Sequence, residues 1–558
     1  MKMTGAQAII KVLLEQGVDT VFGYPGGQVI PLYNALYDAP LHNVLTAHEQ
    51  GAIHAADGYA RASGRTGVCI ATSGPGATNI VTGLATAYLD SVPLVALTGQ
   101  VPVHNLGRDS FQEIDIVGVT MPITKYNLLV RRKEDLVPSL RRAFAIAHEG
   151  RPGPVLVDIP SNLQVEELEW PDEEEQAASQ NPLPKADAAS IEKAAEVLNK
   201  AERPLLLVGG GALHSNAQDE LVQLAEKLDM PVVNTLMGVG AFPASDKHAL
   251  GLTGMHGHIA SNMAVANADV LIVAGSRFSD RVTGDRSRYV GQKTIIQLDI
   301  DPSELDKNVA ASIPVMGDIK DTLTRLLPLV NKEEHADWWR QVRQWDAAED
   351  RSLLHSDKLT APWMMQQLNE AFVGKNAVYV TDVGQHQMWA AQYLKVDKPR
   401  HHLTSGGCGT MGFGLPAALG AAVAEPDAQV VQICGDGGFK MTGMELYTAS
   451  REGLPLISIV VNNSCLGMVR QWQQLFYDAR YSSTLLTEFD FIGFAKACGA
   501  DGARAATQQE LKEALAQSMA NRDKKRPFVI EAVIAQGDIV EPMVAPGAAV
   551  DDFVKVQK

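Results

Sequence analysis

One local pattern recurs along the chain and constrains its fold more than any other feature. Short runs of β-branched and aliphatic residues end in glycine, and amphipathic stretches follow them, as in VCIATSGPGATNIVTGLATAY, PLLLVGGGALHSNAQDELVQLAEKL and VVQICGDGGFKMTGMELYTASREG. Continuously apolar strands that alternate with helices are typical of parallel sheets with both faces covered. The pattern therefore predicts doubly wound α/β domains, in which ligands bind beyond the carboxyl ends of the strands, where these glycines lie.

Two polar segments divide this pattern into three blocks. Residues 166–190 are acidic, contain three prolines and lack a predicted strand. Residues 331–360 are equally polar, but Trp338, Trp339 and Trp345 predict a helical connector that packs on a neighbouring block. Segments of this composition separate independently folded units. We therefore expect three doubly wound parallel-sheet domains at residues 1–165, 190–330 and 361–540, followed by a C-terminal tail at 541–558.

Composition and charge exclude several classes of protein. Hydrophobic residues make up 46% of the 558 residues and charged residues 20%, which is typical of a globular protein and not of a disordered one. The 48 Lys and Arg residues against 65 Asp and Glu residues give a net charge of −17, which argues against a nucleic-acid-binding protein. The five cysteines are far apart without a C-x-x-C pair, so a reducing compartment is expected.

The first twenty residues, MKMTGAQAIIKVLLEQGVDT, predict an amphipathic helix rather than a signal peptide. Lys11 and Glu15 interrupt the apolar residues, and no small-residue cleavage site follows. No apolar run reaches the roughly 18 residues that a membrane span needs. We therefore expect a cytoplasmic protein without a membrane span.

The most specific motif lies in the third block. Gly435-Asp436-Gly437 follows the apolar run QVVQIC, and after 24 further residues the run LPLISIVV ends in Asn462-Asn463. Either half alone would more often be a tight turn. Together, at two neighbouring strand ends, they offer the oxygen ligands that Mg²⁺ prefers when it also binds phosphate oxygens. The glycines allow the backbone to approach a diphosphate, so the pair predicts a metal–diphosphate site.

This pair of motifs resembles the signature of thiamine-diphosphate enzymes. In that family two Gly-rich turns, here VTDVGQHQMW and TSGGCGTMGFGLPAA, hold the diphosphate and the aminopyrimidine. The resemblance implies that the Gly409 carbonyl and the Met411 amide bond the pyrimidine, while the Met411 side chain bends the cofactor into a V shape. It implies Mg²⁺ ligation by Asp436, Asn463 and the main-chain oxygen of Cys465. The implied thiamine-diphosphate residues are Glu49, Gly384, Gln385, His386, Gly409, Met411, Gly435, Asp436, Gly437, Gly438, Asn463, Cys465, Leu466, Gly467 and Met468.

The first block supplies a carboxyl group for this cofactor. Glu49 follows the run NVLTAH and opens the stretch EQGAIHAADGYARA. A glutamate at a helix N-terminus is usually structural, because the helix dipole favours it there. The context AHEQGA, however, resembles that of the family's catalytic glutamate, which bonds the far pyrimidine nitrogen and works best when shielded from water. In the family this glutamate serves a second subunit, which implies a homodimer or homotetramer.

The middle block begins PLLLVGGGAL, which is not G-x-G-x-x-G and is alone a weak nucleotide signal. The segments NTLMG, LGLTGMHG, VAGSRFSDRVTG, LDIDP and MGD follow at predicted strand ends. Gly-rich strand ends occur in every doubly wound domain, but this ordered set resembles the FAD-binding segments of acetohydroxyacid (acetolactate) synthases. The implied FAD residues are Arg151, Gly209, Gly210, Gly211, Thr235, Leu236, Met237, Gly254, Met255, His256, Gly275, Arg277, Asp280, Arg281, Val282, Asp299, Ile300, Gly317 and Asp318.

The resemblance to the catalytic subunits of that family covers nearly the whole chain. It implies decarboxylation of pyruvate and carboligation to pyruvate or 2-ketobutyrate in branched-chain amino-acid synthesis, with a small regulatory subunit as a partner in many members. An arginine can bind the acceptor carboxylate, and a tryptophan can narrow the acceptor pocket. The implied catalytic residues are Glu49, Gly27, Gln112 and Lys125. The implied substrate residues are Phe111, Arg281, Met468, Val469 and Trp472.

The chain departs from the family pattern near the expected active site. Pro160-Ser161-Asn162 stands where the family usually has Pro-Lys-Asp, and Gln28 follows YPGG where a small residue is usual. Acceptor preference and inhibitor sensitivity therefore stay open. Two alternative activities stay open as well: a pyruvate oxidase that uses both cofactors, and a catabolic acetolactate synthase without FAD, which the middle-block motifs oppose.

Overall fold

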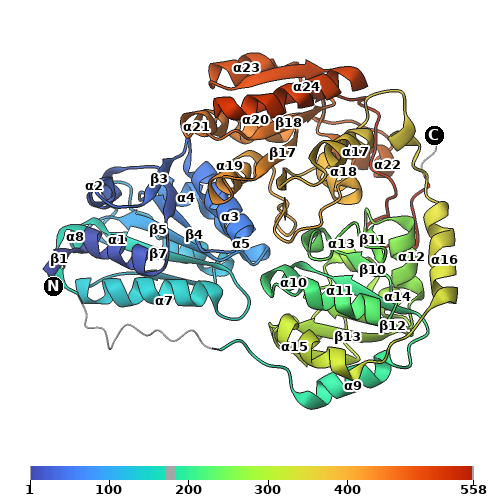
Figure 1. Cartoon of the computed structure of the whole chain (residues 1–558). Coiled ribbons are helices and arrows are strands. Elements are labelled where there is room, and N and C mark those ends of the chain that lie inside the picture. The colour runs from blue at the N-terminus through green and yellow to red at the C-terminus, as the bar shows by residue number, and fades with distance from the viewer. Residues whose placement is uncertain (1, 171–181, 556–558) are drawn as a thin grey trace.

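The computed structural model describes residues 2–170 and 182–555 (Figure 1). Within these residues the chain forms three six-stranded sheets and one two-stranded sheet. All strand pairs in the three large sheets are parallel. Figure 1 shows the three sheets as separate lobes surrounded by helices, in blue, green and orange. The expected fold class of three doubly wound parallel-sheet domains is confirmed.

The N-terminal sheet has the strand order β3-β2-β4-β5-β7-β6. Every residue of β4, β5 and β7 is buried, as expected for central strands covered on both faces. Its strands are β2 (Thr20–Gly23), β3 (His42–Leu45), β4 (Gly67–Ala71), β5 (Leu94–Gln100), β6 (Tyr126–Leu129) and β7 (Pro154–Pro160). Its helices are α1 (Gly5–Glu15), α2 (Ile30–Tyr37), α3 (Glu49–Ser63), α4 (Pro75–Asn79), α5 (Val81–Leu89), α6 (Ile116–Thr120), α7 (Leu136–His148) and α8 (Ser161–Val165).

The middle sheet has the order β11-β10-β9-β12-β13-β14. Its strands are β9 (Pro204–Val208), β10 (Val232–Asn234), β11 (Ala249–Leu252), β12 (Val270–Ala274), β13 (Thr294–Asp299) and β14 (Ile313–Met316). Its helices are α9 (Ala188–Leu198), α10 (Gly210–His214), α11 (Gln218–Lys227), α12 (Ile259–Asn267), α13 (Asp280–Thr283), α14 (Arg286–Val290) and α15 (Ile319–Leu326). The predicted Gly-rich segments thus follow strands that end at one edge of this sheet.

The C-terminal sheet has the order β16-β15-β17-β18-β20-β19. Because β17 and β18 are parallel neighbours, Gly-Asp-Gly and Asn-Asn do leave the sheet side by side. The strands are β15 (Ala377–Thr381), β16 (His402–Leu403), β17 (Gln429–Gly435), β18 (Ile457–Asn462), β19 (Asp501–Ala505) and β20 (Phe528–Val533). The helices are α17 (Ala361–Phe372), α18 (Gln385–Tyr393), α19 (Gly414–Ala424), α20 (Asp436–Thr442), α21 (Glu445–Arg451), α22 (Gly467–Phe476), α23 (Phe491–Ala497) and α24 (Gln508–Ala520).

The first predicted linker is partly structured, which corrects the expectation that 166–190 lacks a strand. β8 (Glu167–Glu169) pairs antiparallel with β1 (Lys2–Thr4). This strand buries only Leu168, so no apolar alternation marks it in the sequence. Residues 171–181 of the predicted linker lie outside the described residues.

The second predicted linker contains the expected helix, α16 (Ala336–Ala347). Trp338 and Trp339 are buried on the middle domain, where their ring N–H groups donate to the carbonyl oxygens of Pro204 and Asp229. None of the helices in the described residues has both the length and the apolar character that a membrane span requires.

Two glycines allow the N-terminal and C-terminal domains to pack closely through α3 and α19. A Cβ atom at Gly58 would lie 2.1 Å from the carbonyl oxygen of Ala417, and one at Gly420 would lie 1.8 Å from that of Ala55. Only glycine fits at such contacts. Buried residues of both domains therefore join in one continuous apolar core.

Candidate active site

The carboxylate of Asp436 lies at the carboxyl end of β17, where α20 begins. Its side chain is buried, and Oδ1 accepts a hydrogen bond from the Gly437 N–H over 2.9 Å. Oδ2 has no hydrogen-bond partner among the described residues. Burial raises the pKa of this carboxyl group to about 6. Because a buried carboxylate oxygen without a partner is costly, the position suits a ligand of a divalent cation.

The side-chain amide of Asn463 lies at the end of the neighbouring strand β18. Its Nδ2 donates to Gln385 Oε1 over 3.1 Å, and its Oδ1 accepts from the Cys465 N–H over 3.3 Å. These bonds fix the amide and leave its oxygen with a second lone pair. Burial raises the pKa of the Cys465 thiol to about 11, so the thiol stays protonated near neutral pH. The Cys465 main-chain oxygen is therefore a better candidate ligand than its sulfur.

These groups line a small cavity of about 50 Å³ at the edge of the C-terminal sheet. Burial lowers the pKa of the lining residue His386 to about 3, so its imidazole is neutral. No lysine or arginine is among the described residues that line the cavity, so a diphosphate bound here would need a cation to balance its charge. The cavity gathers the predicted residues Gly384, Gln385, His386, Met411, Gly435, Asp436, Gly437, Gly438, Asn463, Cys465, Leu466, Gly467 and Met468.

A much larger cavity, of about 1950 Å³, adjoins the first and runs along the strand ends of the middle domain. Gly409, which is predicted to bind the pyrimidine, lines this cavity and not the small one. Four of the five predicted substrate residues line it, and Phe111 does not. The predicted FAD residues that line it are Arg151, Gly210, Gly211, Thr235, Leu236, Met237, Met255, His256, Gly275, Arg277, Asp280, Arg281, Val282, Asp299, Ile300 and Asp318.

Three predicted FAD residues, all glycines, lie behind this lining. A Cβ atom at Gly209 would lie 2.2 Å from the carbonyl oxygen of Gly275, and one at Gly317 would lie 2.5 Å from the Ala186 nitrogen. Gly254 has a φ of 107° and is equally tight against its neighbours. These glycines therefore bring backbone segments together beneath the cavity wall, whereas Gly210 and Gly211 form the wall itself.

Arg281 of the middle domain and Trp472 of the C-terminal domain meet in the lining of this cavity. The guanidinium carbon of Arg281 lies 5.5 Å from the centre of the Trp472 ring, within the range of a cation–π contact. The Arg281 side chain is 57% exposed and its Nη1 lies 3.9 Å from Asp280 Oδ2, a loose ion pair that leaves further N–H groups for an anionic ligand. The pair therefore combines one positive charge with one bulky apolar wall.

Glu49 is the first residue of α3, on the N-terminal domain. Its Oε2 accepts a hydrogen bond from Asn79 Nδ2 over 3.0 Å, and the side chain is only 12% exposed. A Cβ atom at Gly76 would lie 3.3 Å from its Oε1, so a larger residue there would crowd the carboxylate. Glu49 lines neither cavity of its own chain.

Two further predicted catalytic residues lie at the same edge of the N-terminal sheet. Gly27 begins a short turn in which the Gln28 N–H donates to Thr72 Oγ1 over 3.2 Å. Gln112 has a positive φ of 60° and packs against Gly74, just before the helix whose Asn79 bonds Glu49. Its neighbour Phe111 is 83% exposed. The structure thus brings Glu49, Gly27 and Gln112 to one exposed edge.

Lys125 is not brought to this edge. Its Nζ donates to the carbonyl oxygens of Ile146 and Glu149 over 2.5 Å each, at the C-terminal end of α7. Burial lowers the pKa of this ammonium group to about 8. In this position Lys125 satisfies the last carbonyl groups of a helix, which is a structural role. Neither cavity is lined by it.

The comparisons with known proteins agree with this geometry. The chain matches three families, described as "Thiamine pyrophosphate enzyme, N-terminal TPP binding domain" over residues 3–119, "central domain" over 191–326 and "C-terminal TPP binding domain" over 382–532. The "Probable acetolactate synthase large subunit" of Methanocaldococcus jannaschii is 46% identical over 99% of this chain and 95% of its own length. The chain belongs to the acetolactate synthase large-subunit family. Other members are the "Acetolactate synthase isozyme 3 large subunit" of Escherichia coli, 42% identical over 99% of this chain and 98% of its own length, and the large subunit of Haemophilus influenzae, 40% identical with the same coverage.

Membership of the acetolactate synthase family makes thiamine diphosphate a cofactor of this chain, since two of the matched domains bind it. The C-terminal match contains Asp436 and Asn463. The N-terminal match contains Glu49 and Gln112 but ends before Lys125. The unpartnered oxygen of Asp436 and the glycine-lined cavity beside it fit the metal–diphosphate end of this cofactor.

Among the residues that sequence reasoning missed in this acetolactate synthase fold is a buried carboxylate beside Glu49. Glu445, at the start of α21, accepts hydrogen bonds from the N–H groups of Ala47 and His48 over 3.1–3.2 Å. These are the residues directly before Glu49, and a Cβ atom at Gly51 would collide with the Glu445 carboxylate. The C-terminal domain thereby fixes the start of α3. No sequence signal joins residues almost 400 positions apart.

Proposed function

We propose that this chain is the catalytic subunit of an acetolactate synthase. It decarboxylates pyruvate and joins the remaining two-carbon unit to pyruvate or 2-ketobutyrate, giving 2-acetolactate or 2-aceto-2-hydroxybutyrate for branched-chain amino-acid synthesis. The observation that carries the proposal is the wall shared by the two cavities, formed by Val383, Gly384, Met411, Met468 and Val469. A cofactor anchored in the small cavity would present its reactive end to the large one.

Bound thiamine diphosphate supplies the carbanion chemistry by which a 2-keto acid loses carbon dioxide and its remaining fragment joins a second keto acid. The chain's own residues would bind the cofactor, orient it toward the substrates and shield it from water. Asp436, Asn463 and the Cys465 main-chain oxygen would hold Mg²⁺ against the diphosphate. Met411 lines both cavities, and its side chain would support the bend of the cofactor.

We propose that Glu49 serves the cofactor site of a second copy of the chain, so that the enzyme is a homodimer or a dimer of dimers. Glu49 lies at an exposed edge and lines neither cavity of its own chain. Ile30, Phe111 and Met121 are 61%, 83% and 66% exposed on the same domain. Apolar side chains with this exposure fit a surface that a second copy covers. From there the Glu49 carboxyl group would hold a proton shared with a pyrimidine nitrogen.

We propose FAD as the ligand of the large cavity. Its volume of about 1950 Å³ exceeds the roughly 300–1,000 Å³ of ordinary ligand pockets, which leaves room for a dinucleotide beside the substrates. Gly210 and Gly211 let a ligand approach the backbone, and Arg277 supplies positive charge for its phosphates. The acceptor keto acid would bind between Arg281 and Trp472, where the arginine meets its carboxylate and the ring limits its side chain.

A small regulatory subunit is proposed as a partner, because the relatives from Haemophilus influenzae and Escherichia coli are named large subunits. The cytoplasm is the proposed location. All cysteines in the described residues are free thiols, as a reducing compartment requires.

Purified chain incubated with pyruvate, thiamine diphosphate, Mg²⁺ and FAD is expected to form 2-acetolactate, and added 2-ketobutyrate is expected to give the mixed product as well. Chromatography of the two products also measures acceptor preference. Absence of both products with all cofactors present would reject the proposal. Peroxide or acetyl phosphate with bleaching of FAD would instead indicate a pyruvate oxidase. Full activity of a colourless, FAD-free protein would indicate the catabolic enzyme.

A further inference from the structure

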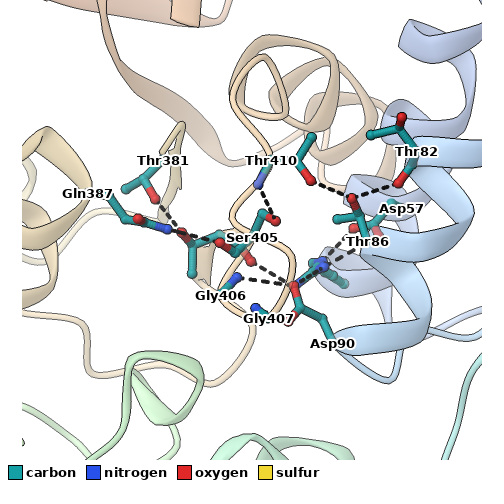
Figure 2. Close-up of polar contacts among 12 residues, drawn as sticks. Asp57, Thr82, Thr86, Asp90, Thr381, Gln387, Ser405, Gly406, Gly407 and Thr410 are labelled. Carbon is teal, nitrogen blue, oxygen red and sulfur yellow. Dashed lines mark hydrogen bonds and ion pairs between the residues drawn. The ribbon is translucent and has the colours of Figure 1, made fainter. Parts of the chain in front are cut away.

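The loop that joins β16 to α19 carries Gly409 and Met411, the two residues proposed to hold the pyrimidine. Its far end is fixed by its own domain. Asp382, which follows β15, accepts hydrogen bonds from the N–H groups of Gly412 over 3.0 Å and Gly414 over 2.8 Å. Its near end is fixed by a residue of the N-terminal domain (Figure 2). The pyrimidine-binding residues therefore lie between anchors from two domains.

Asp90 is the N-terminal residue that reaches this loop. It follows α5, and its side chain is fully buried. Oδ2 accepts from the Gly406 N–H over 3.2 Å and Oδ1 from the Gly407 N–H over 2.7 Å. A Cβ atom at Gly407 would lie 2.8 Å from Asp90 Oδ1, so glycine is required for this approach. Hydrogen bonds from N–H groups to a buried carboxylate are among the stronger ones in proteins.

Arg61 on α3 balances the charge of Asp90. Its Nη2 lies 2.9 Å from Asp90 Oδ2, and its Nη1 donates to the carbonyl oxygen of Thr404 over 2.8 Å. The Nε edge of the same guanidinium group pairs with Asp57. A carboxylate at the C-terminal end of a helix opposes the helix dipole, so Asp90 does not stabilise α5. Its contacts instead connect the N-terminal domain to the loop.

A neutral contact one turn earlier on α5 supports the same loop. The hydroxyl oxygens of Thr86 and Thr410 lie 2.7 Å apart, and the Thr410 N–H donates to Ser405 Oγ over 3.1 Å. Figure 2 shows both contacts, with Thr410 between Thr86 and Ser405. Charged and neutral contacts from one helix thus flank Gly409.

We propose that Asp90, held by Arg61, is a positioning residue for the pyrimidine-binding loop. The N-terminal domain of each chain then has two tasks: it presents Glu49 to a second copy, and it sets the position of Gly409 and Met411 in its own C-terminal domain. The inference rests on the proposed function, because that function assigns the pyrimidine to this loop. Asp90 also lines the large cavity proposed for FAD, but its role here is to hold the pyrimidine-binding loop rather than to contact the pyrimidine itself.

Asp90→Asn keeps the size of the side chain but removes its charge and one acceptor, and we expect it to raise the Kd for thiamine diphosphate by about tenfold. Amide exchange of residues 406–412 should rise by about tenfold in the cofactor-free protein, while exchange elsewhere in the C-terminal domain stays unchanged. Calorimetry with thiamine diphosphate and Mg²⁺, and hydrogen–deuterium exchange, measure the two quantities. Wild-type values for both would overturn the proposal.

Asp158→Asn is the matched control, because Asp158 is a buried aspartate of the same domain that accepts from Thr98 and Gln100 rather than from the loop. Equal weakening of cofactor binding by both variants would indicate general destabilisation and would overturn the proposal. If Asp90→Asn does not fold, Thr86→Val takes its place. A Kd for thiamine diphosphate raised about two- to fivefold in this variant supports the proposal, and an unchanged Kd rejects it. The exchange measurement needs no substrate, so failure of the chain to form acetolactate would reject the proposed function without deciding this inference.

Discussion

Glu49→Gln is expected to lower kcat by about 10²–10⁴-fold while thiamine diphosphate still binds. Glutamine has nearly the same shape, so its side-chain oxygen can keep the 3.0 Å hydrogen bond from Asn79. It cannot, however, hold and release the proton that a carboxyl group shares with the pyrimidine nitrogen. Loss of rate without loss of affinity distinguishes this role from cofactor binding.

Steady-state acetolactate formation and calorimetric titration with thiamine diphosphate measure the two quantities. Glu169→Gln, an exposed glutamate of the same domain, is the control and should leave both unchanged. Turnover of Glu49→Gln within a few fold of wild type would remove Glu49 from the catalytic role.

Asp436→Ala is expected to abolish Mg²⁺-dependent binding of thiamine diphosphate. The substitution removes the only carboxylate among the described residues that line the small cavity, where the diphosphate is proposed to bind. Loss of residues that merely support metal ligands costs roughly 10–100-fold in metal affinity, so loss of a charged ligand should cost at least about 100-fold. Without the cation, the uncharged side chains that line the cavity cannot balance the negative charge of a diphosphate.

Titration of thiamine diphosphate at a series of Mg²⁺ concentrations measures this effect. Asp427→Asn, an exposed aspartate of the same domain, provides the control. A variant at Asp436 that binds the cofactor with unchanged affinity and unchanged dependence on Mg²⁺ would show that the metal lies elsewhere.

The fold and the meeting of Asp436 with Asn463 at one sheet edge could be predicted because both depend on local sequence. An apolar run followed by glycine specifies a buried parallel strand and its ligand-binding end together. Asp436 and Asn463 each lie just after an apolar run, and their meeting requires only that β17 and β18 be neighbours. β8 escaped prediction because its three residues bury a single leucine.

The supporting contacts could not be predicted, because they join residues that are distant in sequence. Asp90 meets Gly407, and Glu445 meets His48, through backbone N–H groups that every residue type except proline carries. Lys125 shows the converse case, in which the sequence indicates a catalytic residue and the structure places it away from the site. Its residue type suits catalysis, but only the structure shows its ammonium group on the last carbonyls of α7.

Co-expression of Glu49→Gln with Asp436→Ala tests most directly the claim that two copies of the chain form each cofactor site. In a mixed dimer one site carries both substitutions and the other carries neither. Random association makes about half of the dimers mixed, so activity should recover to about a quarter of wild type, although each variant alone is inactive. A co-expressed mixture as inactive as its separate components would contradict the account, because a site built within one chain would leave every site with one substitution.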